Sequence, residues 1–216
     1  VGQIAEAALT AVSTLPARLG PMPDSVLRIV ELPRWSGFGA FALRGMVLFP
    51  EHRGFLLDER AGGVDLLLRR VAHEVGHQWW GHSVEPPQAE GSLLLVESLA
   101  KDAEQAVVQS VHGAAGVDAI LAYDEDRYLV GRADAGGDEP ALERLTDEPW
   151  LYYGKGSLMM HAVRAAVGDS SVDAALRSVI ARHRGSGGVA TAPVLRSALL
   201  AHARTATDSA AIVEWF

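Results

Sequence analysis

The stretch VAHEVGHQWWGH, residues 71–82, places two histidines four positions apart, with a glutamate directly after the first. Apolar residues at positions 67, 68, 71 and 75 form one stripe, which predicts a helix that starts near Val64. On such a helix His73 and His77 share a face and can point both imidazoles at one metal ion. Glu74 lies about 100° further round, where a carboxylate can reach a water on the metal rather than the metal itself.

Several residues near this motif can be weighed as a further ligand. A third histidine does not follow at the extended-motif spacing, because Trp80 and Ser83 occupy the diagnostic positions. His82 lies about 140° round the helix from the second histidine, so it cannot share the metal unless the helix breaks. Glu85 and Glu90 fall in a proline-containing segment, EPPQAEG, which predicts a loop.

Glu97 lies in the next predicted helix, from which it can face the histidine pair. Catalytic zinc normally has three protein ligands and a water, so we predict that His73, His77 and Glu97 bind one zinc ion per chain. Glu104 follows seven residues later on the same helix face. It is predicted either to hydrogen-bond a ligand histidine or to face solvent.

The composition excludes several other kinds of site. The chain has 216 residues, a net charge of −8 and no cysteine, so disulfides and thiolate metal sites are excluded. The acidic balance gives no broad electrostatic footprint for nucleic acid, and we expect no nucleic-acid partner. No apolar run has the length of a membrane span. Because the chain begins at Val1 instead of methionine, we expect a fragment of a longer protein.

The periodicity of the rest of the chain predicts a few strands followed by many helices. Strands are expected over 25–33, 45–50 and 54–57. A flexible loop is expected over 131–140, where glycine, aspartate and proline gather. Helices are expected over 3–15 (ended by Pro16), 92–111, 118–130, 154–168, 171–184 and 192–205. The predicted fold class is therefore α+β, predominantly α.

Two motifs resemble a known family. The zinc helix HEVGHQWWGH with LLVESLA (94–100) resembles the gluzincins and, within them, the aminopeptidase N (membrane alanyl aminopeptidase) family. The stretch WLYYGKGSLMMHAVR (150–164) resembles the Y-x-K-G segment of that family. The resemblance implies that Tyr153 binds the oxyanion of the reaction, with Tyr152 as the competing assignment. It also implies a zinc-dependent aminopeptidase that hydrolyses N-terminal peptide bonds with water activated by Glu74.

The same resemblance implies a thermolysin-like zincin catalytic domain. We expect a single peptidase domain over 1–216, with a small α/β part at 1–60 and a helical zinc-binding lobe at 61–216. Nineteen residues separate His77 from Glu97, one more than is typical of the family. This spacing resembles thermolysin and a bacterial branch whose peptidase-like domains are joined to transporter-permease-type membrane segments. The full-length protein is then expected to carry membrane-embedded segments or further domains.

A second departure concerns the family's G-x-M-E-N motif, whose glutamate binds the free amine of the substrate. In its place stands LFPEHRGF (48–55), where Glu51 is the residue that would match. A peptide is the expected substrate. If Glu51 points elsewhere, the same zinc chemistry describes an endopeptidase. A third alternative is a non-catalytic peptide-binding or sensing module of a larger membrane protein.

Overall fold

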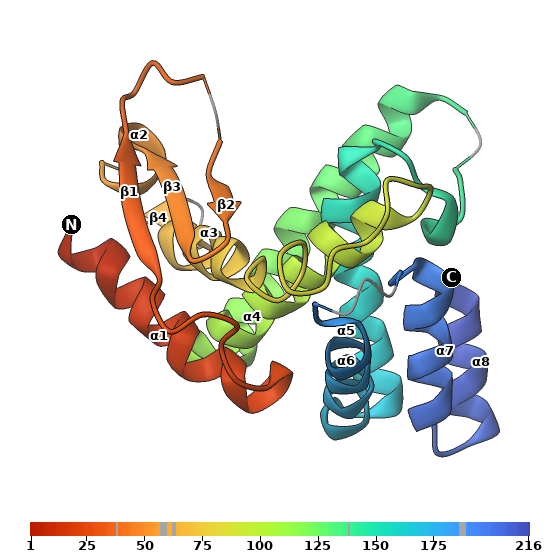
Figure 1. The fold of residues 1–216 in the computed structure, drawn as a ribbon. Helices are drawn as coiled ribbons and strands as arrows, with labels where there is room; N and C mark the ends of the chain where they lie inside the picture. Colours follow the sequence, from red (N-terminus) through yellow and green to blue (C-terminus); the bar gives the residue numbers. More distant parts are fainter. Residues whose placement is uncertain (38, 57–59, 62–63, 138, 186–188) are drawn as a thin grey trace.

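The computed structural model describes residues 1–37, 39–56, 60–61, 64–137, 139–185 and 189–216. The described part is mostly helical, with a small sheet near the N-terminus, which confirms the predicted fold class. Figure 1 shows α1 and the sheet at one end of the molecule and α5 to α8 at the other, with α3 and α4 between them. The metal motif therefore lies at the junction of the two parts.

Helix α1 (Gly2–Leu19) is longer than the sequence predicts. Its buried stripe includes Ile4, Ala11 and Leu15 and continues to Leu19, beyond the proline that was expected to end it. Proline at position 16 removes one backbone hydrogen bond, but packing of this last turn offsets the loss. The helix ends at Gly20, whose φ of 89° is readily adopted only by glycine.

The sheet has the order β1–β3–β2. Strand β1 (Arg28–Leu32) pairs in parallel with β3 (Met46–Pro50), and the edge strand β2 (Phe41–Leu43) pairs antiparallel with β3. Strands β1 and β3 confirm two predictions, whereas β2 was missed because three residues carry too little periodicity. The strand predicted over 54–57 is wrong for its described residues, because helix α2 (Glu51–Gly54) starts directly after β3. Residue 57 lies outside the described residues.

The metal-motif helix begins at a well-defined cap. The short strands β4 (Arg60–Ala61) and β5 (Val64–Asp65) pair with each other and lead into α3 (Leu66–Gly76). Asp65 caps this helix, because its Oδ1 accepts the backbone N–H of Leu68 at 2.9 Å. The predicted helix is therefore confirmed, with its start two residues later than expected.

The long central helix combines two predicted ones. A π-helical segment, η1 (Leu94–Ser98), runs directly into α4 (Leu99–Ala135). The gap between the predicted helices is only a kink at Gly113, where φ is 63° and ψ is −160°. Helix α4 also occupies the first half of the loop expected over 131–140, and residue 138 lies outside the described residues.

The segment 150–167 packs against α4, and the helices that follow it pack against this segment and against one another. Three of the C-terminal helices confirm the helices predicted over 154–168, 171–184 and 192–205, and the last helix was not predicted. The elements are η2 (Leu142–Arg144), η3 (Trp150–Lys155), α5 (Gly156–Val167), α6 (Asp169–His183), α7 (Ala192–His202) and α8 (Ala206–Trp215). The domain boundaries stay a prediction. None of the helices in the described part is long and apolar enough to cross a membrane.

Candidate metal centre and cleft

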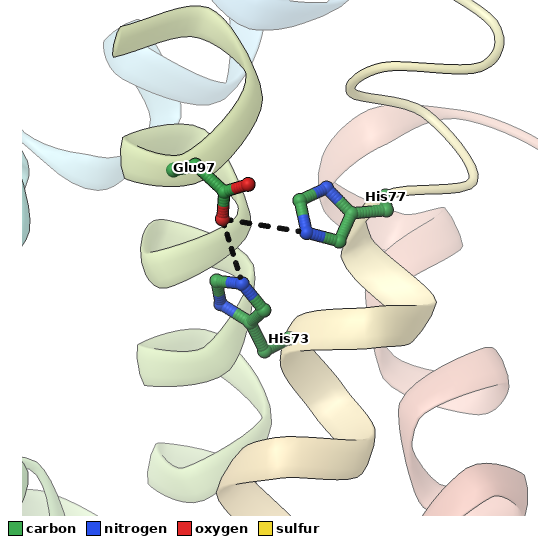
Figure 2. Close-up of side chains that lie close together, drawn as sticks. All are labelled: His73, His77 and Glu97. Carbon is green, nitrogen blue, oxygen red and sulfur yellow. Dashed lines mark hydrogen bonds and ion pairs between the residues drawn. The ribbon is translucent and has the colours of Figure 1, made fainter. Parts of the chain in front are cut away.

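The three predicted ligands meet at one point. Figure 2 shows the imidazole of His73, from α3, and that of His77, directly after this helix, both directed at the carboxylate that η1 supplies. The Nε2 atom of His73 lies 3.1 Å from Oε2 of Glu97, and the Nε2 atom of His77 lies 3.5 Å from the same oxygen. All three candidate ligand atoms lie within 4.8 Å of one another. Residues twenty positions apart in the sequence therefore form one compact donor set.

This donor set fits a zinc ion. Ligand atoms at about 2.1 Å from zinc with tetrahedral angles lie about 3.4 Å apart. The two nitrogen–oxygen distances, 3.1 and 3.5 Å, bracket that value. Two imidazole nitrogens and one carboxylate oxygen are also a ligand combination known from catalytic zinc sites. His73, His77 and Glu97 are thus suited to hold the metal and leave a fourth position for substrate or water.

The outer nitrogens of both histidines have partners of their own. The Nδ1–H of His77 donates to the Trp80 carbonyl at 3.1 Å, which leaves Nε2 free as a ligand. The Nδ1 atom of His73 lies 3.7 Å from Oε2 of Glu104, which is 1% exposed and lies in the interior, not in solvent. Burial alone would raise the pKa of Glu104, but Arg69 and other nearby cations hold it well below its usual range. An ionised carboxylate therefore faces the ligand.

Two π-helical segments meet beside the metal motif, one carrying Glu97 and the other Tyr153. Ser98 donates its hydroxyl to the carbonyl of Tyr152 at 2.8 Å and so joins them. A Cβ added at Gly156 would overlap the Ser98 side chain, so only glycine permits this contact. Irregular helical turns of this kind are frequent at functional sites, because they redirect individual side chains.

Glu74 and Tyr153 line one cavity of about 530 Å³ together with the three metal ligands. Glu74 is 7% exposed, and burial raises the pKa of its carboxyl group. The ring centroid of Tyr153 lies 5.6 Å from that of His73. Burial, and after it the nearby Glu97 carboxylate, raises the pKa of the Tyr153 hydroxyl, so this hydroxyl keeps its proton and can donate a hydrogen bond. Tyr152 instead directs its hydroxyl to Asp147 Oδ1 at 3.4 Å. The geometry therefore favours Tyr153 over Tyr152 as the residue that binds the oxyanion.

The structure does not bring Glu51 to this cavity. Glu51 is the first residue of α2 at the end of β3, and the described wall of the cavity is formed by Ala40, Phe41 and Ala42 instead. The physical reason is the strand order: β2 is the edge strand that borders the cavity, and β3 lies behind it. Glu51 is thus not among the described residues that line the cavity, and the substrate-binding role expected of it stays a prediction. The wall residues from β2 were missed because short apolar side chains give no chemical signal.

The loop after the motif helix also contributes to the cavity. Glu85, which is exposed, and the half-buried His82 both line it, whereas Glu90 is exposed and is not among the described lining residues. Among the residues that the structure describes, Glu85 is the lining carboxylate besides Glu74 and Glu97. It was considered as a metal ligand from the sequence, but the three-residue metal group does not include it.

This chain is similar to known metallopeptidases in sequence and in fold. Residues 25–209 match the sequence model of the Peptidase family M1 domain. A variant of the M1 zinc metallopeptidase from Deinococcus radiodurans superposes with a TM-score of 0.71 at 23% identity, over 97% of this chain and 43% of that one. Its complex with the substrate Tyr-Ser-Ala gives 0.69 at 23% identity, over 99% and 43% of the two chains.

A variant of a two-domain M1 zinc metallopeptidase bound to L-tryptophan gives a TM-score of 0.69 at 22% identity, again over 99% of this chain and 43% of that one. The present chain thus spans less than half the length of the solved structures that it matches. No curated protein is similar enough to match. Because the family model covers most of the chain and the fold agrees with a solved member, this chain belongs to peptidase family M1.

Proposed function

We propose that this chain is the core of a zinc-dependent aminopeptidase, which hydrolyses the N-terminal bond of a peptide. The observation that carries the proposal is the convergence of His73 Nε2, His77 Nε2 and Glu97 Oε2 in the wall of a cavity that Glu74 and Tyr153 also line. A metal held only for structure needs neither a base nor a hydroxyl donor beside it. The two extra side chains therefore favour catalysis over a non-catalytic binding module.

The chemistry divides between the metal and the chain. When bound, zinc polarises the scissile carbonyl and lowers the pKa of water towards about 7. Glu74 takes a proton from the attacking water and then delivers it to the nitrogen of the leaving amine as the C–N bond breaks. Its raised pKa makes it a stronger proton acceptor than an exposed glutamate. Tyr153 donates a hydrogen bond to the oxygen that gains negative charge.

Recognition of the free amine needs a second acidic group in the cleft. A buried or half-buried ammonium is costly unless a carboxylate pairs with it. Since Glu51 is not among the described residues that line the cavity, we assign this role to Glu85, which lines it. The solved relatives were captured with a tripeptide and with free L-tryptophan and L-arginine, which is the substrate and product class of an enzyme that acts at peptide ends.

The absence of Glu51 from the described lining of the cavity also supports a second candidate, an endopeptidase with the same metal chemistry. The uncharged wall at Ala40–Ala42 presents nothing that would select a free amine over an internal peptide bond. The proposed partner in both cases is a peptide. Membrane-embedded segments in the full-length protein stay a prediction.

The test is a panel of aminoacyl fluorogenic amides, each with a free and with an acetylated amine, assayed with and without a zinc chelator. The proposal predicts chelator-sensitive hydrolysis of the free-amine substrates alone. Equal hydrolysis of acetylated peptides would establish the endopeptidase instead. Zinc bound at one ion per chain without hydrolysis of any substrate would favour the binding module.

A further inference from the structure

A group of charged side chains is buried behind the metal motif. Lys101, Glu104 and Asp124 lie on α4 and are 1%, 1% and 0% exposed, and Arg69 on α3 is 9% exposed. The Nζ atom of Lys101 lies 2.6 Å from Glu104 Oε1 and 2.8 Å from Asp124 Oδ2. The Nε atom of Arg69 lies 2.7 Å from the same Glu104 oxygen. Two cations and two anions thus form one compact interior cluster.

The contacts of this cluster are directional. Oε1 of Glu104 is occupied by Lys101 and Arg69, so Oε2 is the oxygen left to face His73 Nδ1, 3.7 Å away. Loss of the lysine contact would free the carboxylate to turn towards the arginine. The orientation of the ligand imidazole then depends on a residue that does not touch it.

The cluster also reaches the segment that carries the proposed oxyanion donor. Asp124 Oδ2, which binds Lys101, accepts the hydroxyl of Ser157 at 2.7 Å. Ser157 is fully buried on α5, four residues after Tyr153, and its hydroxyl and carbonyl both accept from Gln105 Nε2 at 2.9 Å. Lys101 therefore contacts both Glu104, which faces the ligand His73, and Asp124, which binds Ser157 near the start of α5.

Stability alone does not account for this arrangement. Buried ion clusters lose hydration on folding, and well-packed apolar side chains of similar size are often as stable or more stable in their place. Groups that orient a metal ligand, by contrast, need directional contacts that apolar side chains lack. Outside this cluster lies another buried cation, Arg164, whose carboxylate partners Asp102 and Asp173 lie 2.6 to 2.7 Å away. That cation serves as an internal control.

We propose that Lys101 is a positioning residue of the metal centre: it holds Glu104 against His73 and, through Asp124 and Ser157, links the ligand helix to the segment that carries Tyr153. This inference rests on the zinc site of the proposed function. It goes beyond that function because it assigns a role to a buried lysine outside the ligand set and outside the cavity wall.

The test compares Lys101→Met with Arg164→Met. Zinc affinity is measured by competition with a chromogenic chelator, and the visible absorption spectrum of bound Co²⁺ reports the ligand geometry. For Lys101→Met we expect an affinity about 10- to 100-fold weaker than wild type, together with a changed cobalt spectrum. Arg164→Met should lower the unfolding temperature but leave both metal readouts as in the wild type. Equal metal readouts for the two variants would overturn the proposal.

A charge-balanced variant guards against misfolding. Lys101→Met with Asp124→Asn leaves the pair Arg69 and Glu104 with no net charge, so it should fold even if the single variant does not. It should still bind zinc about 10-fold more weakly, and wild-type affinity would refute the positioning role. In a Glu104→Gln background, Lys101→Met should cause no further loss, because the lysine acts through that carboxylate. Failure of the wild type to bind zinc would instead overturn the proposed function and this inference together.

Discussion

Gly76 lies where the histidine-bearing segment packs tightly against the helix that follows Glu97. A Cβ atom added at Gly76 would stand 2.9 Å from the Cβ of Ala103 and 3.4 Å from the Cα of Ala100. Carbon atoms in contact normally lie about 3.5 to 4.0 Å apart. The substitution Gly76→Ala would therefore push α3 and α4 apart by about 0.6 to 1 Å.

Two opposed terms set the effect on stability. Alanine is favoured over glycine inside a helix by about 1 kcal/mol. An extra methyl group in a packed interface costs about 1 to 3 kcal/mol. The net loss is about 0 to 2 kcal/mol, which for a chain of this size lowers the unfolding temperature by at most about 8 °C. The fold should survive the change.

The effect on function should be larger than the effect on stability. The histidines stand on α3 and Glu97 precedes α4, so the separation acts directly on the distances between ligands. A misplacement of about 1 Å at a reacting centre can reduce the rate by about 100-fold. We expect kcat/KM to fall by about 10- to 100-fold in the presence of saturating zinc.

The assay measures kcat/KM on the best aminoacyl amide, and calorimetry gives the unfolding temperature. Gly2→Ala is the matched control, because Gly2 is also helical and nothing lies within 4 Å of its added Cβ. The control should keep full activity. A Gly76→Ala variant with unchanged kcat/KM and a raised unfolding temperature would refute the argument from close packing.

Other predictions concern the residues in and near the cavity. Glu74→Gln should retain one zinc per chain in metal analysis but lose about 10²- to 10⁴-fold in kcat, and retained turnover would exclude it as the base. Tyr153→Phe should reduce kcat by about 10²- to 10³-fold, whereas Tyr152→Phe should change it little; the reverse order would exchange their roles. Glu85→Gln should raise KM for free-amine substrates, and Glu51→Gln should leave this KM unchanged. A stronger effect at Glu51 would contradict the cavity wall described above.

The metal site could be predicted from the sequence because its geometry is local. Two histidines four residues apart on a helix must share a face, whatever the rest of the fold does. Glu97 required only one further assumption, that the next helix packs against the first. The structure brings these side chains together, with the Gly76 contact as the place where the helices meet.

The cavity wall could not be predicted in the same way. Glu51 follows a strand and precedes the motif by a suitable number of residues, but the sequence does not indicate that β2, and not the end of β3, borders the cavity. The choice between Tyr152 and Tyr153 likewise depends on a π-helical turn, which no period in the sequence indicates. The proposed role of Lys101 could not be predicted either. Glu104 lies near it in the sequence, but Asp124, its other partner, lies much further along α4.

The central claim is that His73, His77 and Glu97 bind the catalytic zinc. The most direct measurement is anomalous X-ray diffraction at the zinc edge from crystals of the zinc-loaded chain. The account predicts one strong peak about 2.1 Å from Nε2 of both histidines and from a carboxylate oxygen of Glu97. A peak at other residues, or no peak in crystals grown with zinc, would contradict it.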